Sequence, residues 1–267
     1  MPRTLKLTIA YDGSAYSGWQ RQANAPSIQA VIEDEIATIV GAPNPLVAAG
    51  RTDAGVHAAA QVASITIDHP ISCDDLLKAL NARLKAGDIR IRAIDETFDR
   101  FDARIFAKSK TYRYAIWNGA LPSPFIRHVV WHVPYVLDLQ RMTTAVTPLV
   151  GEQDFAAFQG RGADVKTTVR RVLSAQLREI AVDTEQPIAV SPLDDPSRDG
   201  RLLRLEISGT GFLRYMVRNI AGTLVDIGRG HFAPEDMRRI IDSRDRTEAG
   251  QTAPPQGLML WKVDYDP

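Results

Sequence analysis

The sequence predicts an α+β fold made of two related halves. Segments in which apolar and polar side chains alternate, as they do in strands, are interspersed with segments of helical periodicity. A weak internal sequence repeat indicates the two halves. The strand patterns at residues 5–9 and 203–207 are each followed by a glycine turn and an aromatic segment. We expect one half over residues 1–105 and the other over residues 106–267, each a sheet with helices on one face.

The first half is predicted to run strand, helix, strand, helix, strand. Alternation predicts strands over residues 5–11, 61–67 and 89–93. Ser27 is a good N-cap residue, and isoleucine and valine follow it at helical spacing. Ser72 begins a pattern that resembles a capping box ahead of several leucines. A helix is therefore expected after each of these serines.

The second half combines further strands and helices with a long connection. Strands are expected over residues 110–117, 168–177 and 202–207. Helices are expected over residues 138–150, 215–227 and 235–243. Residues 183–200 are rich in proline and acidic residues, so we expect an exposed, mobile hairpin loop there.

Charge and composition exclude several classes of protein. The chain carries 32 basic and 32 acidic residues, so it is not a globally basic nucleic-acid binder, although local basic patches remain open. Cys73 is the only cysteine, which rules out an intramolecular disulfide, and the five histidines are scattered. We expect no metal. No apolar run reaches membrane-spanning length, so a cytoplasmic protein is predicted.

Three segments are locally basic, and they lie over residues 100–127, 161–178 and 209–230; the first and the third also contain aromatic residues. Basic residues outnumber acidic ones by six to one in the first segment and by five to one in the second. Such segments suit a nucleic-acid backbone whose bases are splayed out and stacked on aromatic rings. The alternative is that the charges lie on solvated strand faces while the rings fill the core.

The most unusual segment is the run from Gly50 to Ala59, where polar residues crowd between two glycines. Gly50 and Gly55 allow a tight loop, because glycine adopts backbone angles that other residues resist. Such a loop would hold the Asp53 carboxylate beside the Arg51 guanidinium. An ordinary surface turn with solvated side chains is the alternative.

Arg218 and Tyr112 are candidates for completing a site around this loop. Arg218 lies in an otherwise apolar helical segment, and a buried arginine needs an anionic partner. Asp53 is one candidate partner, and the alternative is that Arg218 extends from the core to solvent. Arg214 is four residues earlier and is expected on the same helical face. Tyr112 and Tyr114 share one face of a strand, so one is expected in the core and the other beside a cleft.

Six ordered motifs in this chain resemble those of the TruA family of tRNA pseudouridine synthases. They are Gly50-Arg51-Thr52-Asp53-Ala54-Gly55-Val56-His57-Ala58, Tyr11-Asp12-Gly13 with residues 16–22, residues 101–104 with 110–114, residues 151–158, residues 211–218 and residues 253–258. The resemblance covers nearly the whole chain. Gln153 departs from it, because the family usually has histidine there, and the segment 183–200 is longer than usual.

This resemblance implies a fold and an activity. The fold is the pseudouridine-synthase fold, with a central mixed sheet flanked by helices and a basic active-site cleft. The activity is isomerisation of uridine to pseudouridine at positions 38, 39 and 40 in the anticodon arm of tRNA. The resemblance also implies that no cofactor is needed, and that the protein is a homodimer in which one tRNA contacts both subunits.

The resemblance further implies a role for each of five residues. Asp53 is the catalytic residue, acting as a nucleophile or as a base at C2′. Tyr112 stacks on the uracil after it leaves the base stack. Arg218 pairs with Asp53 and keeps it charged. Arg51 contacts phosphate or fills the space left by the flipped base, and Leu258 packs against that base.

Two other classes of function are compatible with parts of this pattern. A non-catalytic RNA-binding protein would use the same basic and aromatic segments, but a carboxylate in a phosphate-binding cleft would oppose its affinity. A hydrolase with an aspartate nucleophile would need no extended basic surface. It would usually carry a second acid or base near Asp53, and none is apparent in the sequence.

Overall fold

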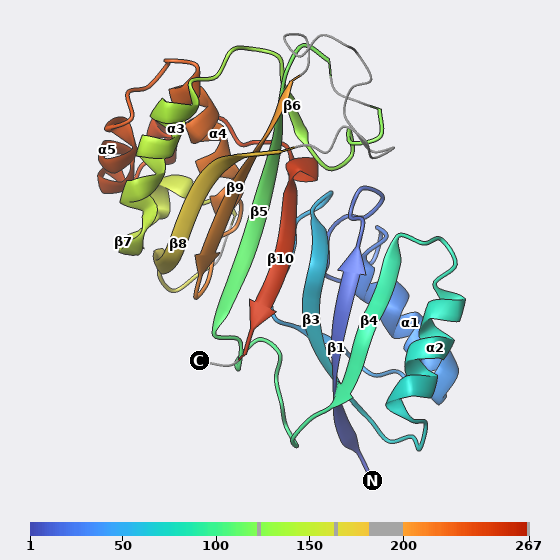
Figure 1. Ribbon diagram of the computed structural model, residues 1–267. Helices are drawn as coiled ribbons and strands as arrows, with labels where there is room; N and C mark the ends of the chain where they lie inside the picture. Colours follow the sequence, from blue (N-terminus) through green and yellow to red (C-terminus); the bar gives the residue numbers. More distant parts are fainter. Residues whose placement is uncertain (122–123, 163–164, 182–199, 266–267) are drawn as a thin grey trace. The chain divides into compact units, whose positions relative to one another are not determined.

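The computed structural model describes residues 1–121, 124–162, 165–181 and 200–265 and divides the chain into two compact units (Figure 1). One unit comprises Met1–Lys110 with Met259–Pro267, and the other comprises Thr111–Leu258. This division differs from the one expected from the sequence, because it falls after residue 110 and assigns the final residues to the first unit. Except for Gly200, the segment expected to be a mobile loop lies outside the described residues.

The first unit contains a mixed sheet in the order β4-β1-β3-β10, with β2 paired to β3. Its strands are β1 (Arg3–Tyr11), β2 (Val47–Ala48), β3 (His57–Ile67), β4 (Ile89–Glu96) and β10 (Leu258–Asp264). The first residue of β10, Leu258, is grouped with the second unit. β1 is antiparallel to both β3 and β4, whereas β10 is parallel to β3. The strands predicted at 5–11, 61–67 and 89–93 are thus confirmed.

Helices α1 (Ile28–Val40) and α2 (Cys73–Arg83) lie on one face of this sheet (Figure 1). Both predicted N-caps are confirmed. The Ser27 side chain accepts a hydrogen bond from Ala30 N, and the Ser72 side chain accepts one from Asp75 N. Every third or fourth residue of α1 from Ile28 to Ile36 is buried, so its apolar stripe forms part of the core.

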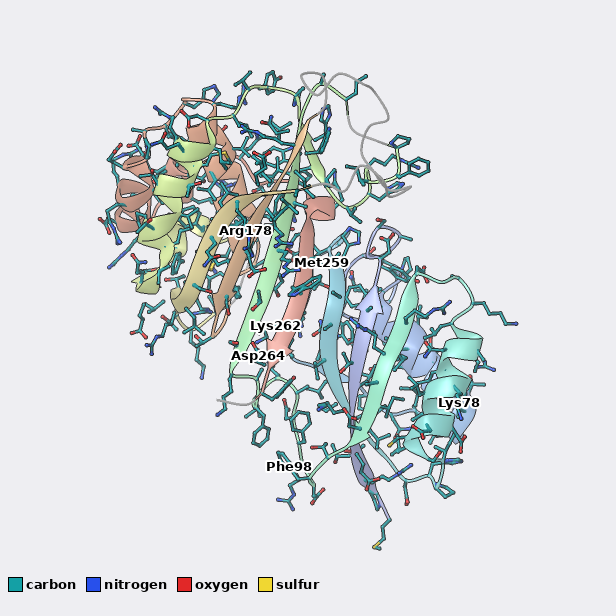
Figure 2. All side chains as sticks on the ribbon, viewed as in Figure 1. Lys78, Phe98, Arg178, Met259, Lys262 and Asp264 are labelled. Atoms are coloured by element: carbon teal, nitrogen blue, oxygen red, sulfur yellow. The ribbon has the colours of Figure 1, made fainter. Side chains whose placement is uncertain are left out.

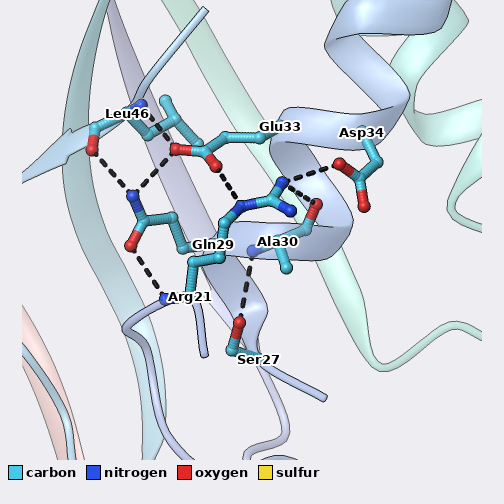
Figure 3. Close-up of polar contacts among 7 residues, drawn as sticks. All are labelled: Arg21, Ser27, Gln29, Ala30, Glu33, Asp34 and Leu46. Atoms are coloured by element: carbon cyan, nitrogen blue, oxygen red, sulfur yellow. Dashed lines mark hydrogen bonds and ion pairs between the residues drawn. The ribbon is translucent and has the colours of Figure 1, made fainter. Parts of the chain in front are cut away.

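A buried carboxylate ties the segment before α1 to that helix (Figure 3). The Glu33 carboxylate accepts hydrogen bonds from Arg21 Nε at 2.7 Å, from Gln29 Nε2 at 2.8 Å and from the Leu46 amide at 2.8 Å. Arg21 also pairs with Asp34, and these two carboxylates raise its pKa. This network fixes the chain that leads from Trp19 into α1.

The second unit contains strands in the order β5-β9-β8-β7, with β6 paired to β5. Its strands are β5 (Ser109–Asn118), β6 (Trp131–Val133), β7 (Gly151–Asp154), β8 (Val169–Ile180) and β9 (Arg201–Gly209). β8 is antiparallel to both β7 and β9, and β6 is parallel to β5. The strands predicted at 110–117, 168–177 and 202–207 are confirmed.

Helices α3 (Leu139–Val146), α4 (Met216–Gly228) and α5 (Asp236–Ser243) lie together on one side of β7, β8 and β9 (Figure 1). The helix predicted at 138–150 is shorter, because a 3₁₀ turn containing Pro148 follows at Thr147–Leu149. Further 3₁₀ turns are Ala156–Phe158, Arg246–Glu248 and Pro255–Gly257. An α+β fold with mixed pairing is therefore confirmed. In the part of the chain that the structure describes, no helix is long and apolar enough to cross a membrane.

Candidate active site

The loop that carries Asp53 lies in the first unit and is held on both sides of that residue. The Thr52 carbonyl accepts a hydrogen bond from the Trp19 amide at 3.0 Å, and the Thr52 hydroxyl lies 2.8 Å from the Tyr11 hydroxyl. On the other side, the Val56 amide donates to the Asp53 carbonyl at 3.1 Å. Thr52 is buried, whereas Asp53 is half-buried. The backbone at Asp53 is therefore fixed while its side chain remains partly accessible.

Glycines in a neighbouring segment allow the close approach that this anchoring needs. A Cβ at Gly18 would lie 2.6 Å from the Thr52 carbonyl oxygen, and one at Gly13 would lie 2.1 Å from the Val56 carbonyl oxygen. Within the loop, Gly55 has a left-handed backbone with φ of 75°. Gly50 is not among the glycines with positive φ, so the expectation that both loop glycines supply unusual angles is correct only for Gly55.

Gly50 instead leaves room for a neighbouring side chain, because the side chain of Lys110 lies close to it. A Cβ at Gly50 would lie 3.2 Å from Lys110 Cε. Burial of the Lys110 ammonium, together with the nearby charge of Arg104, lowers its pKa. Arg51 is exposed on the same loop. The segment around Asp53 thus includes basic groups, although the chain as a whole carries no net charge.

His57 ties the end of the loop to the turn after β1. Its ring is 2% exposed, and its Nδ1 lies 3.2 Å from the Gly13 amide and 3.1 Å from Asp12 Oδ1. Within the described ranges, its Nε2 is buried without a hydrogen-bond partner. His57 begins β3 and pairs with Met259 in the parallel register of β10. The loop therefore ends on a strand that is hydrogen-bonded on both edges.

Tyr112 and Tyr114 on β5 belong to the second unit. Tyr114 is fully buried, its hydroxyl donates to the Pro254 carbonyl at 2.7 Å, and burial raises its pKa. Tyr112 is 8% exposed, and its ring meets Phe212 edge-on with centroids 5.1 Å apart. The expectation that one tyrosine is a core residue is confirmed for Tyr114, whereas Tyr112 is buried as well, and its place beside a cleft stays a prediction.

Arg218 and Leu258 also belong to the second unit, apart from Asp53 and Arg51 in the first. Arg218 is half-buried on α4, and its Nε donates to the Ala253 carbonyl at 2.8 Å. Leu258 is buried at the start of β10. A pairing of Asp53 with Arg218 would involve one residue from each unit, and it stays a prediction.

Sequence reasoning missed the role of Tyr215. This residue has a left-handed backbone with φ of 62°, which is rare for a bulky side chain. Helix α4 therefore begins only at Met216, and Arg214 lies outside it. The expectation that Arg214 and Arg218 share a helical face is wrong. Instead, the guanidinium carbon of each lies 4.8 Å from the centroid of the Tyr215 ring.

Gln153, where the sequence departs from the family pattern, has a structural role on β7. Its Nε2 donates to the Pro148 carbonyl at 2.8 Å, and its Oε1 accepts a hydrogen bond from Arg238 on α5. These contacts link β7 to the 3₁₀ turn after α3 and to α5.

Comparison with known proteins identifies the family of the chain. The family model for tRNA pseudouridine synthases matches residues 7–104 and 145–266. Four of the five proposed site residues lie inside these segments, and Tyr112 lies between them.

Relatives named tRNA pseudouridine synthase A match 98% of this chain. The chain is 41% identical to tRNA pseudouridine synthase A of Geobacter sulfurreducens over 263 residues, which cover 98% of this chain and 100% of the relative. The enzyme of the same name from Geotalea uraniireducens is 42% identical with the same coverage. The one from Acetivibrio thermocellus is 40% identical, also over 98% of this chain and 100% of the relative. The chain therefore belongs to the tRNA pseudouridine synthase family.

Proposed function

We propose that this protein isomerises uridine to pseudouridine at positions 38, 39 and 40 in the anticodon arm of tRNA, with Asp53 as the catalytic carboxylate. Membership of the family supports the reaction type and the tRNA substrate. The observation that carries the assignment to Asp53 is the loop itself. Its backbone is fixed at Thr52 and Val56, and the carboxylate between them is half-buried.

The reaction needs a carboxylate where the base joins the sugar. The C1′–N1 bond breaks, the uracil rotates, and a bond forms between C1′ and C5. The proton on C5 is then lost, and N1 gains one. Product and substrate are isomers, so the net reaction is not an oxidation or a reduction. Asp53 acts either as the nucleophile or as a base at C2′.

The other site residues are proposed to bind and orient the substrate. The uridine must leave its stack before a side chain reaches the sugar–base junction, and Tyr112 would stack on the flipped uracil. Its edge-on contact with Phe212 supports a fixed orientation of the ring. Arg218 would keep Asp53 ionised, because a nearby cation favours the charged form of a carboxylate.

Arg51, Leu258 and the assembly state complete the proposal. Arg51 is exposed beside Asp53, which suits contact with phosphate or with the space that the flipped base leaves. Leu258 would pack against the base. A cytoplasmic homodimer, in which one tRNA contacts both subunits, is also part of the proposal.

Replacing the carboxylate tests the proposal. Asp53→Asn keeps the shape of the side chain, so we expect it to bind tRNA but to form no pseudouridine, as mapped by chemical labelling of unmodified tRNA. Asp74→Asn is the matched control, because Asp74 is exposed on α2 and should leave the activity unchanged. Turnover by Asp53→Asn close to that of the wild type would exclude Asp53 as the catalytic residue.

The same assay separates the enzyme from a non-catalytic RNA-binding protein. If the wild-type protein bound tRNA but formed no pseudouridine in any tRNA tested, the binding function would be favoured and the isomerase proposal would fail.

A further inference from the structure

A hollow of about 490 Å³ lies wholly within the second unit. Its volume is in the range of small-molecule sites in proteins. It lies between the start of α4 and the segment before β10, and its lining includes Gly160, Arg161, Tyr215, Arg246, Ala249 and Thr252. Two of the lining residues are arginines, several offer hydrogen-bond donors, and none is an aspartate or glutamate.

Arg246 is a partly buried cation that has only neutral oxygen atoms as partners. Its Nη2 donates to Asn219 Oδ1 at 3.1 Å and to Thr252 Oγ1 at 3.0 Å, and its Nη1 donates to the Ala249 carbonyl at 3.2 Å. Within the described ranges, no carboxylate forms an ion pair with it. Burial lowers its pKa, which indicates that the surroundings do not compensate its charge. An anion in the hollow would supply that compensation.

Arg161 adds a second positive charge at the hollow. Its side chain is exposed, and the described residues offer it no ion-pair partner, while its carbonyl accepts a hydrogen bond from Arg214 Nη1 at 3.2 Å. Guanidinium groups suit phosphate oxygens especially well, because their planar array of N–H groups donates two parallel hydrogen bonds.

Tyr215 connects the hollow to Arg218. A Cβ at Gly160 would lie 2.4 Å from Tyr215 Cδ2, so the ring lies directly over this glycine. The left-handed backbone of Tyr215 is the kind of strained conformation that clusters at functional sites. The guanidinium of Arg218, the proposed partner of Asp53, also lies against this ring. A ligand in the hollow would therefore be next to the same tyrosine that Arg218 contacts.

We propose that this hollow binds a phosphodiester group of the tRNA backbone, with Arg161 and Arg246 as its charged ligands. The inference rests on the proposed function, because tRNA supplies the phosphate. It adds a binding subsite on the second unit, beside the residues that hold Arg218. An electrostatic contact of this kind positions the RNA and carries no sequence information.

A charge reversal at Arg161 provides the cleanest test, because that side chain is exposed and forms no hydrogen bond or ion pair with the residues that the structure describes. Arg161→Glu should raise the Kd for unmodified tRNA several-fold. It should also reduce the slope of log Kd against log salt by about one. Lys78→Glu makes the same change of charge on the exposed face of α2 (Figure 2) and should match the wild type in both measurements.

Ethylation of tRNA phosphates identifies the contact directly. At one backbone position, ethylation should weaken binding to the wild type, and the same ethylation should weaken binding to Arg161→Glu much less. Arg246→Lys keeps the charge but loses the planar array of donors, so it should weaken the same contact.

The outcomes separate this inference from the proposed function. Unchanged affinity, salt slope and ethylation pattern in Arg161→Glu would overturn the phosphate subsite, provided that the wild type forms pseudouridine. Absence of pseudouridine in the wild type would instead overturn the proposed function.

Discussion

The hydroxyl groups of Tyr11 and Thr52 lie 2.8 Å apart in the buried interior of the first unit. Tyr11 ends β1, and Thr52 directly precedes Asp53. The Gln61 side-chain amide lies 3.5 Å from the same Tyr11 hydroxyl and donates to the Gly50 carbonyl at 2.8 Å. The side chains of Tyr11, Thr52 and Gln61 thus form one buried polar network. It connects β1 and β3 to Gly50 and Thr52, which are the two ends of the segment before Asp53.

Removing the Tyr11 hydroxyl should loosen this loop without changing the packing of the ring. In Tyr11→Phe the buried Thr52 hydroxyl loses its partner, and we expect a loss of about 1–3 kcal/mol in the free energy of unfolding. Urea denaturation measures this loss. Pseudouridine formation should fall as well, because the backbone beside Asp53 becomes less constrained.

A double-mutant cycle with Thr52→Val isolates the contact, because valine keeps the branched shape of threonine. If the two hydroxyls stabilise each other, the sum of the losses of unfolding free energy in the two single variants should exceed the loss in the double variant by about 0.5–1.5 kcal/mol. Strictly additive losses would mean that the two hydroxyls do not stabilise each other.

Gly18→Ala should displace the Asp53 loop. Gly18 has φ of 96°, and a Cβ there would lie 2.6 Å from the Thr52 carbonyl oxygen and 3.1 Å from the Ala54 amide nitrogen. We expect both stability and pseudouridine formation to fall. Gly41→Ala is the matched control, because Gly41 has φ of 76° but nothing within 4 Å of an added Cβ. Gly41→Ala should lower the free energy of unfolding only by the strain of the left-handed backbone, about 1–2 kcal/mol, and should leave the activity of the folded enzyme unchanged.

Substitutions at Tyr112 should separate ring stacking from the hydroxyl. Tyr112→Phe keeps the edge-on contact with Phe212 and should fold normally. Tyr112→Ala should lose about 1–3 kcal/mol of base stacking and also destabilise the fold, because the ring is 8% exposed. Activity must therefore be compared at temperatures where each variant is folded. Equal activity in all three proteins would remove Tyr112 from the site.

Most strands and helices could be predicted because their signals are local. The alternation in β1 and the capping by Ser27 and Ser72 each depend on residues that are neighbours in sequence, and all three are confirmed. The parallel pairing of β10 with β3 joins residues about two hundred positions apart, and no periodicity reports it. For that reason the sequence assigned the last residues to the second half, whereas the structure groups them with the first.

The candidate site could be predicted where a motif identified a residue, but not where a contact gave the residue its role. Asp53 was conspicuous because polar residues crowd around it between glycines. Tyr215 was not, because helical periodicity predicts a right-handed backbone there and only tertiary packing against Gly160 and two arginines favours another. The contact of Lys110 with Gly50 could not be predicted either, because the two residues are far apart in the sequence.

Glu33→Gln should destabilise the segment that supports the Asp53 loop. The substitution removes the negative charge that Arg21 Nε contacts at 2.7 Å, and it puts an amide where two oxygens accept hydrogen bonds. Because Glu33 is buried, we expect a loss of about 1–3 kcal/mol in the free energy of unfolding. The exposed Asp34 gives the matched control, since Asp34→Asn breaks only a surface pair and should cost about 1 kcal/mol or less. Equal losses of unfolding free energy in the two variants would show that the buried position of Glu33 does not make its contacts more stabilising than those of the exposed Asp34.

The stability of the protein should fall above pH 10, and Tyr11 should account for a measurable part of the fall. Burial raises the pKa of Tyr11 from 10.0 to about 12. In the unfolded chain this tyrosine releases its proton near pH 10, while the folded protein retains it up to about pH 12, so the unfolded state binds fewer protons in that interval. Its contribution is complete below pH 10 and declines by about 1.4 kcal/mol for each pH unit up to the folded pKa.

Comparison of the wild type with Tyr11→Phe isolates this contribution. Other groups titrate in the same range: burial also raises the pKa of Tyr114 and Tyr265, whereas the lowered pKa of Lys110 acts in the opposite direction. These effects are common to both proteins and cancel in the difference. Urea denaturation between pH 9 and 12 should therefore show a shallower decline for Tyr11→Phe, by about 1.4 kcal/mol per pH unit above pH 10. Parallel declines would mean that the Tyr11 hydroxyl ionises as readily in the folded protein as in the unfolded chain, and that it does not lie in the buried network beneath Asp53.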